Sequence, residues 1–362
     1  MANSFTSGQQ WSAGLQAQGL RCAALVLGVC LSHGVRADML ALDDDQLAEV
    51  QGAGIGFVVD NAMVDGSKAT TTITGLTDPS GKSVSIAVRN LYLGATGSNK
   101  GATLAPVTIG RLAYPFKLNL YKGSVLTTQL SDGRTVSTLP SDADVLELAF
   151  PPLISGSAGQ PCISGYAGAG SGCSSRASEK LDLGARFDFT LPSGTTTRTD
   201  VLNLNFQELA MDGSYLRFWG SSARSQLVGE LRLNLYAKTL DIMSCAAGTT
   251  NCSSAAEMAA RSVYLTNAYA SVALGYGKSQ PLLFSVASDG NFNLELPALT
   301  SANAADFYAN APRTSLVIDN LNFGGTRPSY GVAPADGSGV NLGRSELSGL
   351  SFNYLKVTSH SL

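Results

Sequence analysis

Histidine is nearly absent from this 362-residue chain, and the shortage excludes several kinds of chemistry. The two histidines are His33 and His360, and His360 is the third residue from the C-terminal end, where chains are usually loosely held. A Ser–His–Asp triad, a histidine general base and a histidine metal site all need an ordered imidazole. We therefore predict no catalytic histidine, no metal and no cofactor, and we expect a protein that is not an enzyme.

Charged residues are also scarce. They make up 14% of the chain, against roughly 25% in a typical soluble domain, and the formal net charge is −3. Nucleic-acid binding needs a basic face, and attraction to anionic lipid needs a run of basic residues. Neither feature occurs, so we expect no nucleic-acid partner.

Long apolar runs are missing as well, and the one short run lies near the start. Residues 1–37 contain no Asp or Glu, and Arg21 precedes the apolar stretch Cys22–Leu31, which is followed by Val35-Arg36-Ala37. This order of basic end, apolar centre and small-residue cleavage site predicts a signal peptide over residues 1–37. The stretch is shorter than the roughly 20 residues of a membrane-spanning helix, although a retained anchor is the alternative.

We therefore expect export by the general secretory route, to the cell surface, the extracellular space or the periplasm. Removal of residues 1–37 leaves 22 basic against 27 acidic residues, a formal charge of −5, and no transmembrane segment.

Cysteines are few once the leader is removed. Cys22 and Cys30 leave with it, and four remain in two close pairs, Cys162/Cys173 and Cys245/Cys252. Four cysteines allow three connectivities, and the short spacing favours local pairing. In an exported protein such pairs indicate disulfides, whereas a zinc site would want CxxC spacing or histidine partners.

The most common pattern in the remaining sequence is alternation of apolar residues with other residues. It is typical of antiparallel strands with one buried and one solvated face. Five Asp-Gly steps, a strong hairpin signal, support this reading; they begin at Asp65, Asp132, Asp212, Asp289 and Asp336. We predict a mainly β protein, with a large antiparallel sandwich-like or rolled-sheet domain and strands at residues 84–88, 116–120, 181–191, 202–206, 231–235, 316–323 and 350–357.

Helical patterns are short. Leu42, Leu47 and Val50 recur at near-helical spacing, and Gly52 can end that helix, so residues 38–56 are predicted as a short helix with a glycine-rich entry segment. A helix this short is marginal alone and must dock on something. One or two minor helices are expected at 255–261 and 302–309.

The β-rich part, residues 57–362, is predicted as one domain, because no charged or proline-rich linker divides it. A sequence echo leaves an alternative open. Lys117-Leu-Asn-Leu-Tyr121 recurs as Arg232-Leu-Asn-Leu-Tyr236, which is compatible with two similar β lobes divided near 156–175. Convergent strand composition is the preferred explanation of the echo.

The candidate site residues lie in the segment richest in apolar side chains. Tyr215, Phe218, Trp219 and Tyr236 could form a binding face, although such a segment is more often a core hairpin. A carboxylate-only hydrolase would need two acids about 5–10 Å apart. The acids in or beside strands, which more often lie on a solvated sheet face, are Glu147, Asp188, Glu208 and Glu230.

The stretch Leu-Ala-Leu-Asp-Asp-x-x-Leu-x-x-Val-x-Gly-x-Gly-Ile, from Leu40 to Ile55 after the leader, resembles exported surface proteins of Gram-negative bacteria. Some of these are described as pilus or filament proteins. The resemblance implies a surface context and carries no catalytic residue with it.

Three functions follow as hypotheses. The first is a non-enzymatic structural or surface protein, such as a pilus- or filament-associated subunit that self-associates or binds other surface proteins. The second is a periplasmic or surface module that binds a glycan or small molecule. The third is a carboxylate-dependent hydrolase.

Overall fold

The structure is a computed structural model that describes residues 54–130, 134–153, 180–193, 195–245, 262–286, 290–324 and 339–359. The predicted leader, nearly all of the short helix that follows it and the minor helix at 255–261 lie outside these residues. So do Cys162, Cys173 and Cys252. In the described part, no helix has the length and apolar character needed to cross a membrane.

One antiparallel sheet of 16 strands contains most of the described chain. Its main path runs through β1 (Ile55–Phe57), β6 (Phe116–Lys122), β9 (Asp144–Ala149), β12 (Tyr215–Ser221), β13 (Gln226–Cys245), β11 (Thr196–Leu209), β10 (Leu181–Ser193), β4 (Ser83–Ala95) and β3 (Val64–Thr77). The strands off this path are β14 (Ser262–Leu274), β15 (Leu282–Val286), β16 (Phe292–Leu296), β17 (Thr314–Phe323), β18 (Val340–Asn341), β19 (Ser345–Leu350) and β20 (Leu355–Thr358). Two small ribbons pair β2 (Val59–Ala62) with β5 (Val107–Ile109), and β7 (Thr128–Gln129) with β8 (Thr135–Val136).

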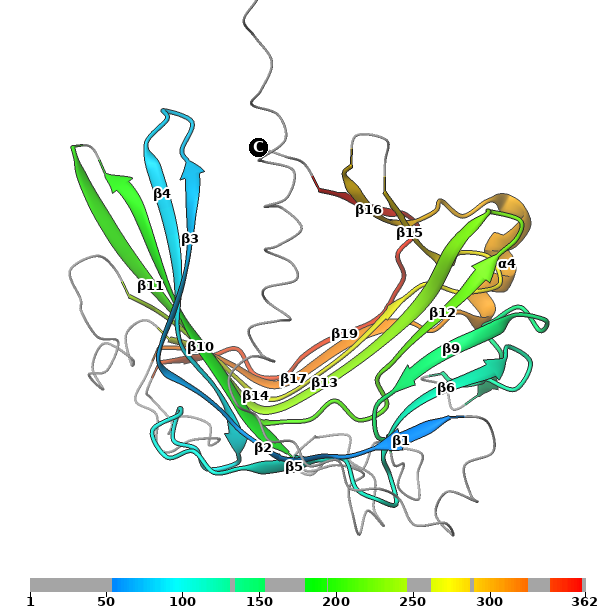
Figure 1. Ribbon diagram of the computed structural model, residues 1–362, viewed down its shortest axis with the longest axis horizontal. Coiled ribbons are helices and arrows are strands. Elements are labelled where there is room, and N and C mark those ends of the chain that lie inside the picture. Colours follow the sequence, from blue (N-terminus) through cyan, green and yellow to red (C-terminus); the bar gives the residue numbers. More distant parts are fainter. Residues whose placement is uncertain are drawn as a thin grey trace, which may run out of the picture.

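The long strand β13 joins two arms of this sheet. Residues 226–232 of β13 pair with β12, and residues 239–245 pair with β11 along the same edge, so β11 and β12 lie end to end. Figure 1 shows the result, a sheet bent into a U with β3, β4, β10 and β11 in one arm and β6, β9 and β12 in the other.

Polar side chains mark the place where the arms meet. The carboxylate of Glu208 accepts hydrogen bonds from Lys180 and Lys238, both 2.6 Å long. Farther across the sheet, Asp319 accepts a 3.0 Å hydrogen bond from Asn267. Glu208 and Asn267 have φ values of 50° and 46°, a left-handed conformation that interrupts regular strand geometry. The bend is therefore lined by paired polar groups.

Buried apolar side chains form several separate clusters. In the arm of β9 and β12, Leu126, Leu139, Val145, Trp219 and Val228 pack together. Near the bend, another cluster brings strands of the other arm against the β2–β5 ribbon, and its buried members are Ala62, Val107, Leu181 and Leu209. Apolar burial in this part of the chain is thus divided between the arms.

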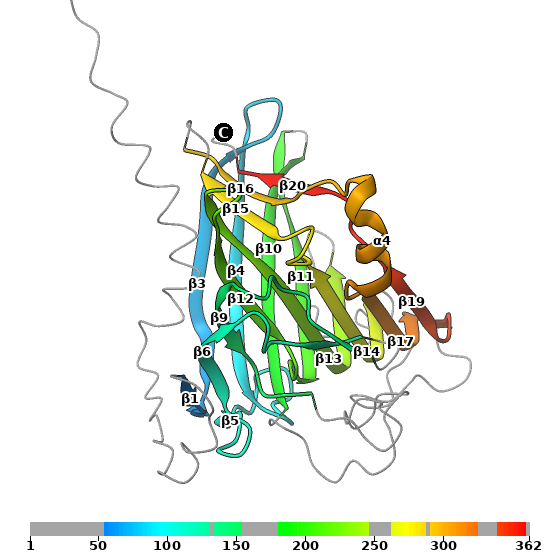
Figure 2. The same cartoon turned by 90° about the vertical axis from the view of Figure 1, so that its right-hand side faces the viewer.

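One helix, α4 (Ser301–Asn310), packs at the margin of the sheet. Its buried Phe307 lies 5.9 Å, ring to ring, from Tyr276. Thr300 caps the first turn through a capping box with Asn303. Figure 2 shows α4 beside β17 and β19, on the side of the sheet away from β3.

The predicted β-rich antiparallel class is confirmed, and of the two expected shapes the rolled sheet describes the single curved sheet better. The helix predicted at 302–309 is confirmed as α4. Two local predictions are wrong. Asp65-Gly66 lies inside β3 rather than in a turn, and the strand expected at 350–357 is two strands, β19 and β20, separated by residues 351–354.

Whether the β-rich part is one domain or two lobes stays a prediction. The described strands before and after residues 156–175 share the same sheet.

Candidate functional site

The candidate site begins with three charged residues that antiparallel pairing brings side by side. Arg217 of β12 lies directly opposite Glu147 of β9 and directly opposite Glu230 of β13. Opposed residues in neighbouring strands project from the same face of a sheet, with Cβ atoms about 5 Å apart. Strand register therefore places the cation between two acids.

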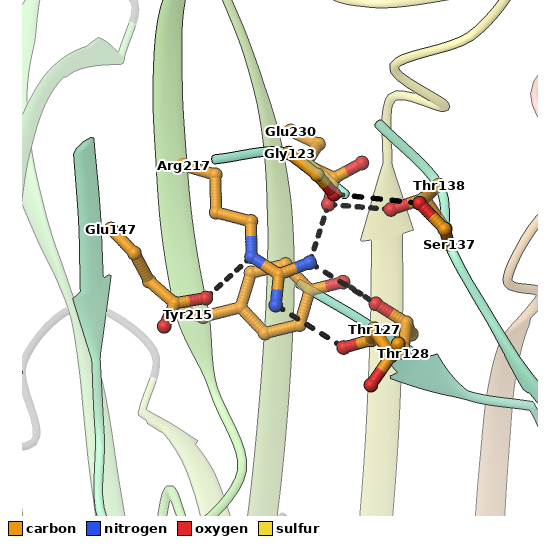
Figure 3. Close-up of polar contacts among 9 residues, drawn as sticks. All are labelled: Gly123, Thr127, Thr128, Ser137, Thr138, Glu147, Tyr215, Arg217 and Glu230. Carbon is orange, nitrogen blue, oxygen red and sulfur yellow. Dashed lines mark hydrogen bonds and ion pairs between the residues drawn. The ribbon is translucent and has the colours of Figure 1, made fainter. Parts of the chain in front are cut away.

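The guanidinium of Arg217 makes a dense set of contacts, shown in Figure 3. Its Nε lies 2.5 Å from Oε2 of Glu147, and its Nη1 lies 2.8 Å from Oε1 of Glu230. Nη1 also donates to the Thr128 hydroxyl, and Nη2 donates to the Thr127 carbonyl. The three charged side chains are all buried, so the cluster is a buried ion triad.

A loop and a tyrosine complete the enclosure. The phenol ring of Tyr215 lies under the guanidinium, 3.9 Å from ring centroid to Cζ of Arg217. Its hydroxyl lies 2.9 Å from that of Thr128. From the segment between β8 and β9, the Thr138 hydroxyl donates to Glu230 over 2.9 Å. The buried polar atoms of the triad thus find partners from several chain segments.

Burial and charge shift the pKa values here in directions that follow from the contacts. Burial raises the pKa of Tyr215 to about 12, and the nearby Glu230 carboxylate adds to the shift. Burial likewise raises the pKa of Glu230, although Arg217 opposes the rise. For Arg217, burial works against the charge, but Tyr215 and the two glutamates outweigh it and raise the pKa of the guanidinium. Arg217 therefore stays charged.

A pocket of about 410 Å³ opens beside the triad. Two residues along the strands from the triad, a neighbouring row lies on the same face of the sheet. It contains one residue from each of β6, β9, β12 and β13, namely Lys117, Ala149, Tyr215 and Arg232. Three of the pocket's lining residues are cations, Lys117, Arg217 and Arg232, and one is an acid, Glu147, which Arg217 already pairs. Two tyrosines, Tyr121 and Tyr215, supply aromatic wall.

Arg232 differs from Arg217 in one respect. Its Nη1 is buried, yet no hydrogen-bond partner for that atom lies among the described residues. A buried donor without an acceptor costs about 1–3 kcal/mol. Arg232 also lines the pocket, so a cationic side chain with one unsatisfied donor forms part of the pocket wall.

No protein-family model, no curated protein and no solved structure matches this chain. Function must therefore be argued from the site itself.

The four residues predicted as a binding face are not brought together. Tyr215 lines the pocket, whereas Trp219 and Tyr236 are buried in separate apolar clusters. Phe218 lies on the opposite face of the sheet from Arg217, with its ring 5.4 Å from that of Phe284. Tyr215 is thus the predicted residue that reaches the pocket.

The four acids predicted as hydrolase candidates are each held by cations. Glu147 and Glu230 share Arg217, and Glu208 is held by two lysines. Asp188 lies 2.9 Å from Arg89 and 2.6 Å from Arg186. Such pairing suits structural acids better than a general acid, which needs a proton at the reacting atom.

Cys245 ends β13, and its predicted partner Cys252 lies outside the described residues, as do Cys162 and Cys173, so both pairings stay predictions. No group of three or more His, Cys, Asp or Glu that could hold a metal occurs within the described ranges.

The cations of the pocket were missed at the level of sequence, although a signal existed. Lys117 and Arg232 are the first residues of the two echoed segments, and register places both in the same row of the sheet. The echo therefore marks two strands of opposite direction whose first residues lie in one row beside the pocket, which the sequence alone does not reveal.

Proposed function

We propose that this chain is an exported, non-enzymatic β protein that binds a small carboxylate-bearing molecule, such as an acidic sugar, in the pocket beside Arg217. The observation that carries the proposal is Arg232, which lines the pocket and whose buried Nη1 has no hydrogen-bond acceptor among the described residues. A guanidinium recognises a carboxylate through charge-assisted and often paired hydrogen bonds.

Size and surroundings support the same ligand class. A volume of about 410 Å³ lies within the usual range for small-molecule sites. Lys117 adds a second cation whose side chain reaches the pocket, while Tyr121 and Tyr215 offer flat surfaces against which a ring can pack. Because Glu147 and Glu230 are engaged by Arg217, they leave the remaining cations available for a ligand anion.

Calorimetric titration tests the proposal with glucuronate as the acidic probe and glucose as its neutral counterpart. We expect glucuronate to bind and glucose not to bind. Arg232→Met should weaken glucuronate binding roughly tenfold or more, since one charge-assisted pair is lost. Arg224→Met, in the exposed turn between β12 and β13, is the matched control and should bind as the parent does.

Failure of glucuronate, and of a wider set of small organic acids at millimolar concentration, to bind the parent protein would remove the proposal. Equal binding by the Arg232→Met variant would show that the ligand lies elsewhere.

A second function, self-association at the surface, is favoured by β3. This strand is 14 residues long and pairs with β4 alone among the described strands. Most of its residues are exposed and several are threonines. An open edge of this kind is a template for pairing with another chain. If β3 mediates assembly, Thr71→Lys with Ile73→Lys should reduce the sedimenting species to monomer, whereas unchanged sedimentation would contradict this role.

A further inference from the structure

Lys117 and Arg232, the two pocket cations outside the ion triad, stand at opposite ends of one row of the sheet. Register places Ala149 of β9 and Tyr215 of β12 between them, and all four residues line the pocket. The row crosses β6, β9, β12 and β13, so the Cα atoms of the two cations lie about 14 Å apart. A ligand that contacts both cations therefore extends across β9 and β12.

Ala149 is the small residue of this row. It carries a single methyl group, whereas its partners on the neighbouring strands are Lys117 and Tyr215. The Tyr215 ring lies 3.9 Å from Cζ of Arg217, so it leans toward the triad rather than over β9 (Figure 3). The middle of the row thus has room for part of a ligand.

The charges in and beside the pocket nearly cancel. Lys117, Arg217 and Arg232 are cations, and Glu147 and Glu230 are acids that share Arg217. Three positive charges and two negative charges leave a formal sum of +1. One carboxylate makes the site neutral, whereas a second would leave an uncompensated negative charge in a partly buried place. The charge balance therefore favours a ligand with a single acid.

The remaining wall suits a neutral part of the ligand. Pockets of this volume, about 410 Å³, usually bury most of a drug-sized molecule, which is larger than one sugar ring. Tyr121 and Thr127 add hydroxyl groups to the wall, and a hydroxyl can both donate to and accept from the hydroxyls of a sugar.

We propose that the ligand is a disaccharide-sized acid with one carboxylate, which pairs with Arg232, and a neutral second ring, whose hydroxyl oxygens accept from Lys117. The proposal rests on the function proposed above and narrows it to one ligand class. The planar guanidinium suits the carboxylate, and the compact ammonium suits single oxygens. Lys117 and Ala149 are then the residues that determine specificity for the second ring.

The test compares four probes by calorimetric titration of the full chain. They are glucuronate, cellobiose, cellobiouronate, in which glucuronate is linked to glucose, and a diglucuronate with the same linkage. We expect cellobiouronate to bind roughly fivefold or more tightly than glucuronate, because Lys117 gains a charge-assisted hydrogen bond. Diglucuronate should bind more weakly than cellobiouronate, and cellobiose should not bind.

Two variants assign the effect to the row. Lys117→Met and Ala149→Leu should each reduce the affinity for cellobiouronate to that for glucuronate, while leaving glucuronate binding unchanged. Lys122→Met is the matched control, because Lys122 lies on the same strand but on the opposite face, where it is exposed and pairs with Asp144. It should bind every probe as the parent does.

The outcomes separate this proposal from the function on which it rests. Equal affinities for glucuronate and cellobiouronate would overturn the two-ring ligand and leave the acid site intact. Tighter binding of diglucuronate than of cellobiouronate would overturn the single charge. If neither glucuronate nor cellobiouronate binds, the proposed function itself fails, and this proposal fails with it.

Discussion

Arg217 shows how much of this protein's polar chemistry lies inside the sheet. The residue is buried between two glutamates, and each glutamate would be left as an uncompensated buried charge without it. We predict that Arg217→Met lowers the free energy of unfolding by about 3–5 kcal/mol, the usual cost of breaking a buried pair from one side. Urea denaturation measures this loss.

The matched control is Arg198→Met. Arg198 pairs with Asp200, but its side chain is half exposed, so the expected cost is below about 1 kcal/mol. If both variants lose the same small amount of unfolding free energy, the ion triad does not stabilise the arm of β9 and β12. Should Arg217→Met not fold, combining it with Glu147→Gln and Glu230→Gln should restore folding, since the orphaned charges are then removed.

Glu208 leads to a pH prediction. Burial acts to raise its pKa, but hydrogen bonds and charges from Lys180 and Lys238 outweigh burial and lower the pKa below its ordinary value of 4.5. A lowered folded-state pKa contributes stability that is present above the unfolded-state pKa and is lost as the pH falls through the folded-state pKa.

Glu208→Gln should therefore cost about 2 kcal/mol at pH 7, and the difference from the parent should shrink as the pH falls below about 4.5. Urea denaturation at several pH values between 7 and 3 measures it. Glu346→Gln, at a half-exposed position of β19, is the control and should cost under about 1 kcal/mol. A difference for Glu208→Gln that does not vary with pH would contradict this assignment.

At the scale of single elements, close approach of the chain explains why some strand positions are glycine. Gly184 of β10 has no space for a side chain, because an added Cβ would lie 2.5 Å from Cε1 of Tyr92 and 2.8 Å from the Leu204 carbonyl oxygen. We predict that Gly184→Ala lowers the free energy of unfolding by about 1–3 kcal/mol through overpacking.

Gly220 of β12 supplies the comparison within the same sheet. Nothing lies within 4 Å of an added Cβ there, so Gly220→Ala should change stability by less than about 0.5 kcal/mol or increase it slightly. Thermal unfolding of both variants is the measurement. Equal effects would mean that strand propensity, rather than contact with Tyr92, decides the outcome.

Patterns along single elements were readable from the sequence, and their exceptions have local causes. Alternation correctly predicts that β10 and β11 are strands, but the buried residues of β11 are Val201, Asn205 and Leu209 rather than the alternating leucines and Phe206. Asp65-Gly66 misleads because Gly66 allows the Leu91 carbonyl to approach, 2.5 Å from an added Cβ, so the dipeptide serves strand contact instead of a turn. Asp212-Gly213 does turn, but it connects β11 to β12 end to end rather than as a hairpin.

On the scale of the whole molecule, the two arms share the strands β13 and β14. β13 pairs with β12 at one end and with β11 at the other, and β14 follows it across the bend. If the strands of one arm unfold, part of β13 loses its pairing partner, and β13 also belongs to the other arm. We therefore predict a single cooperative unfolding transition, with equal calorimetric and van't Hoff enthalpies.

Fluorescence of Trp219, which is buried in one arm, should change together with far-UV circular dichroism of the whole sheet. Two separate transitions would favour the alternative of two lobes divided near 156–175. Protein that starts after residue 37 lacks Trp11, so its tryptophan fluorescence comes from Trp219 and is specific to that arm.

The sequence by itself determined the secondary-structure class, the helix predicted at 302–309 and the scarcity of histidine, because these depend on local periodicity and composition. It could not show the triad or the pocket. Glu147 lies 70 residues before Arg217 and Glu230 lies 13 residues after it, and the three meet because strand register aligns β9, β12 and β13. Register depends on which strands pair and on the bend between the arms, and both are decided by packing across the whole sheet.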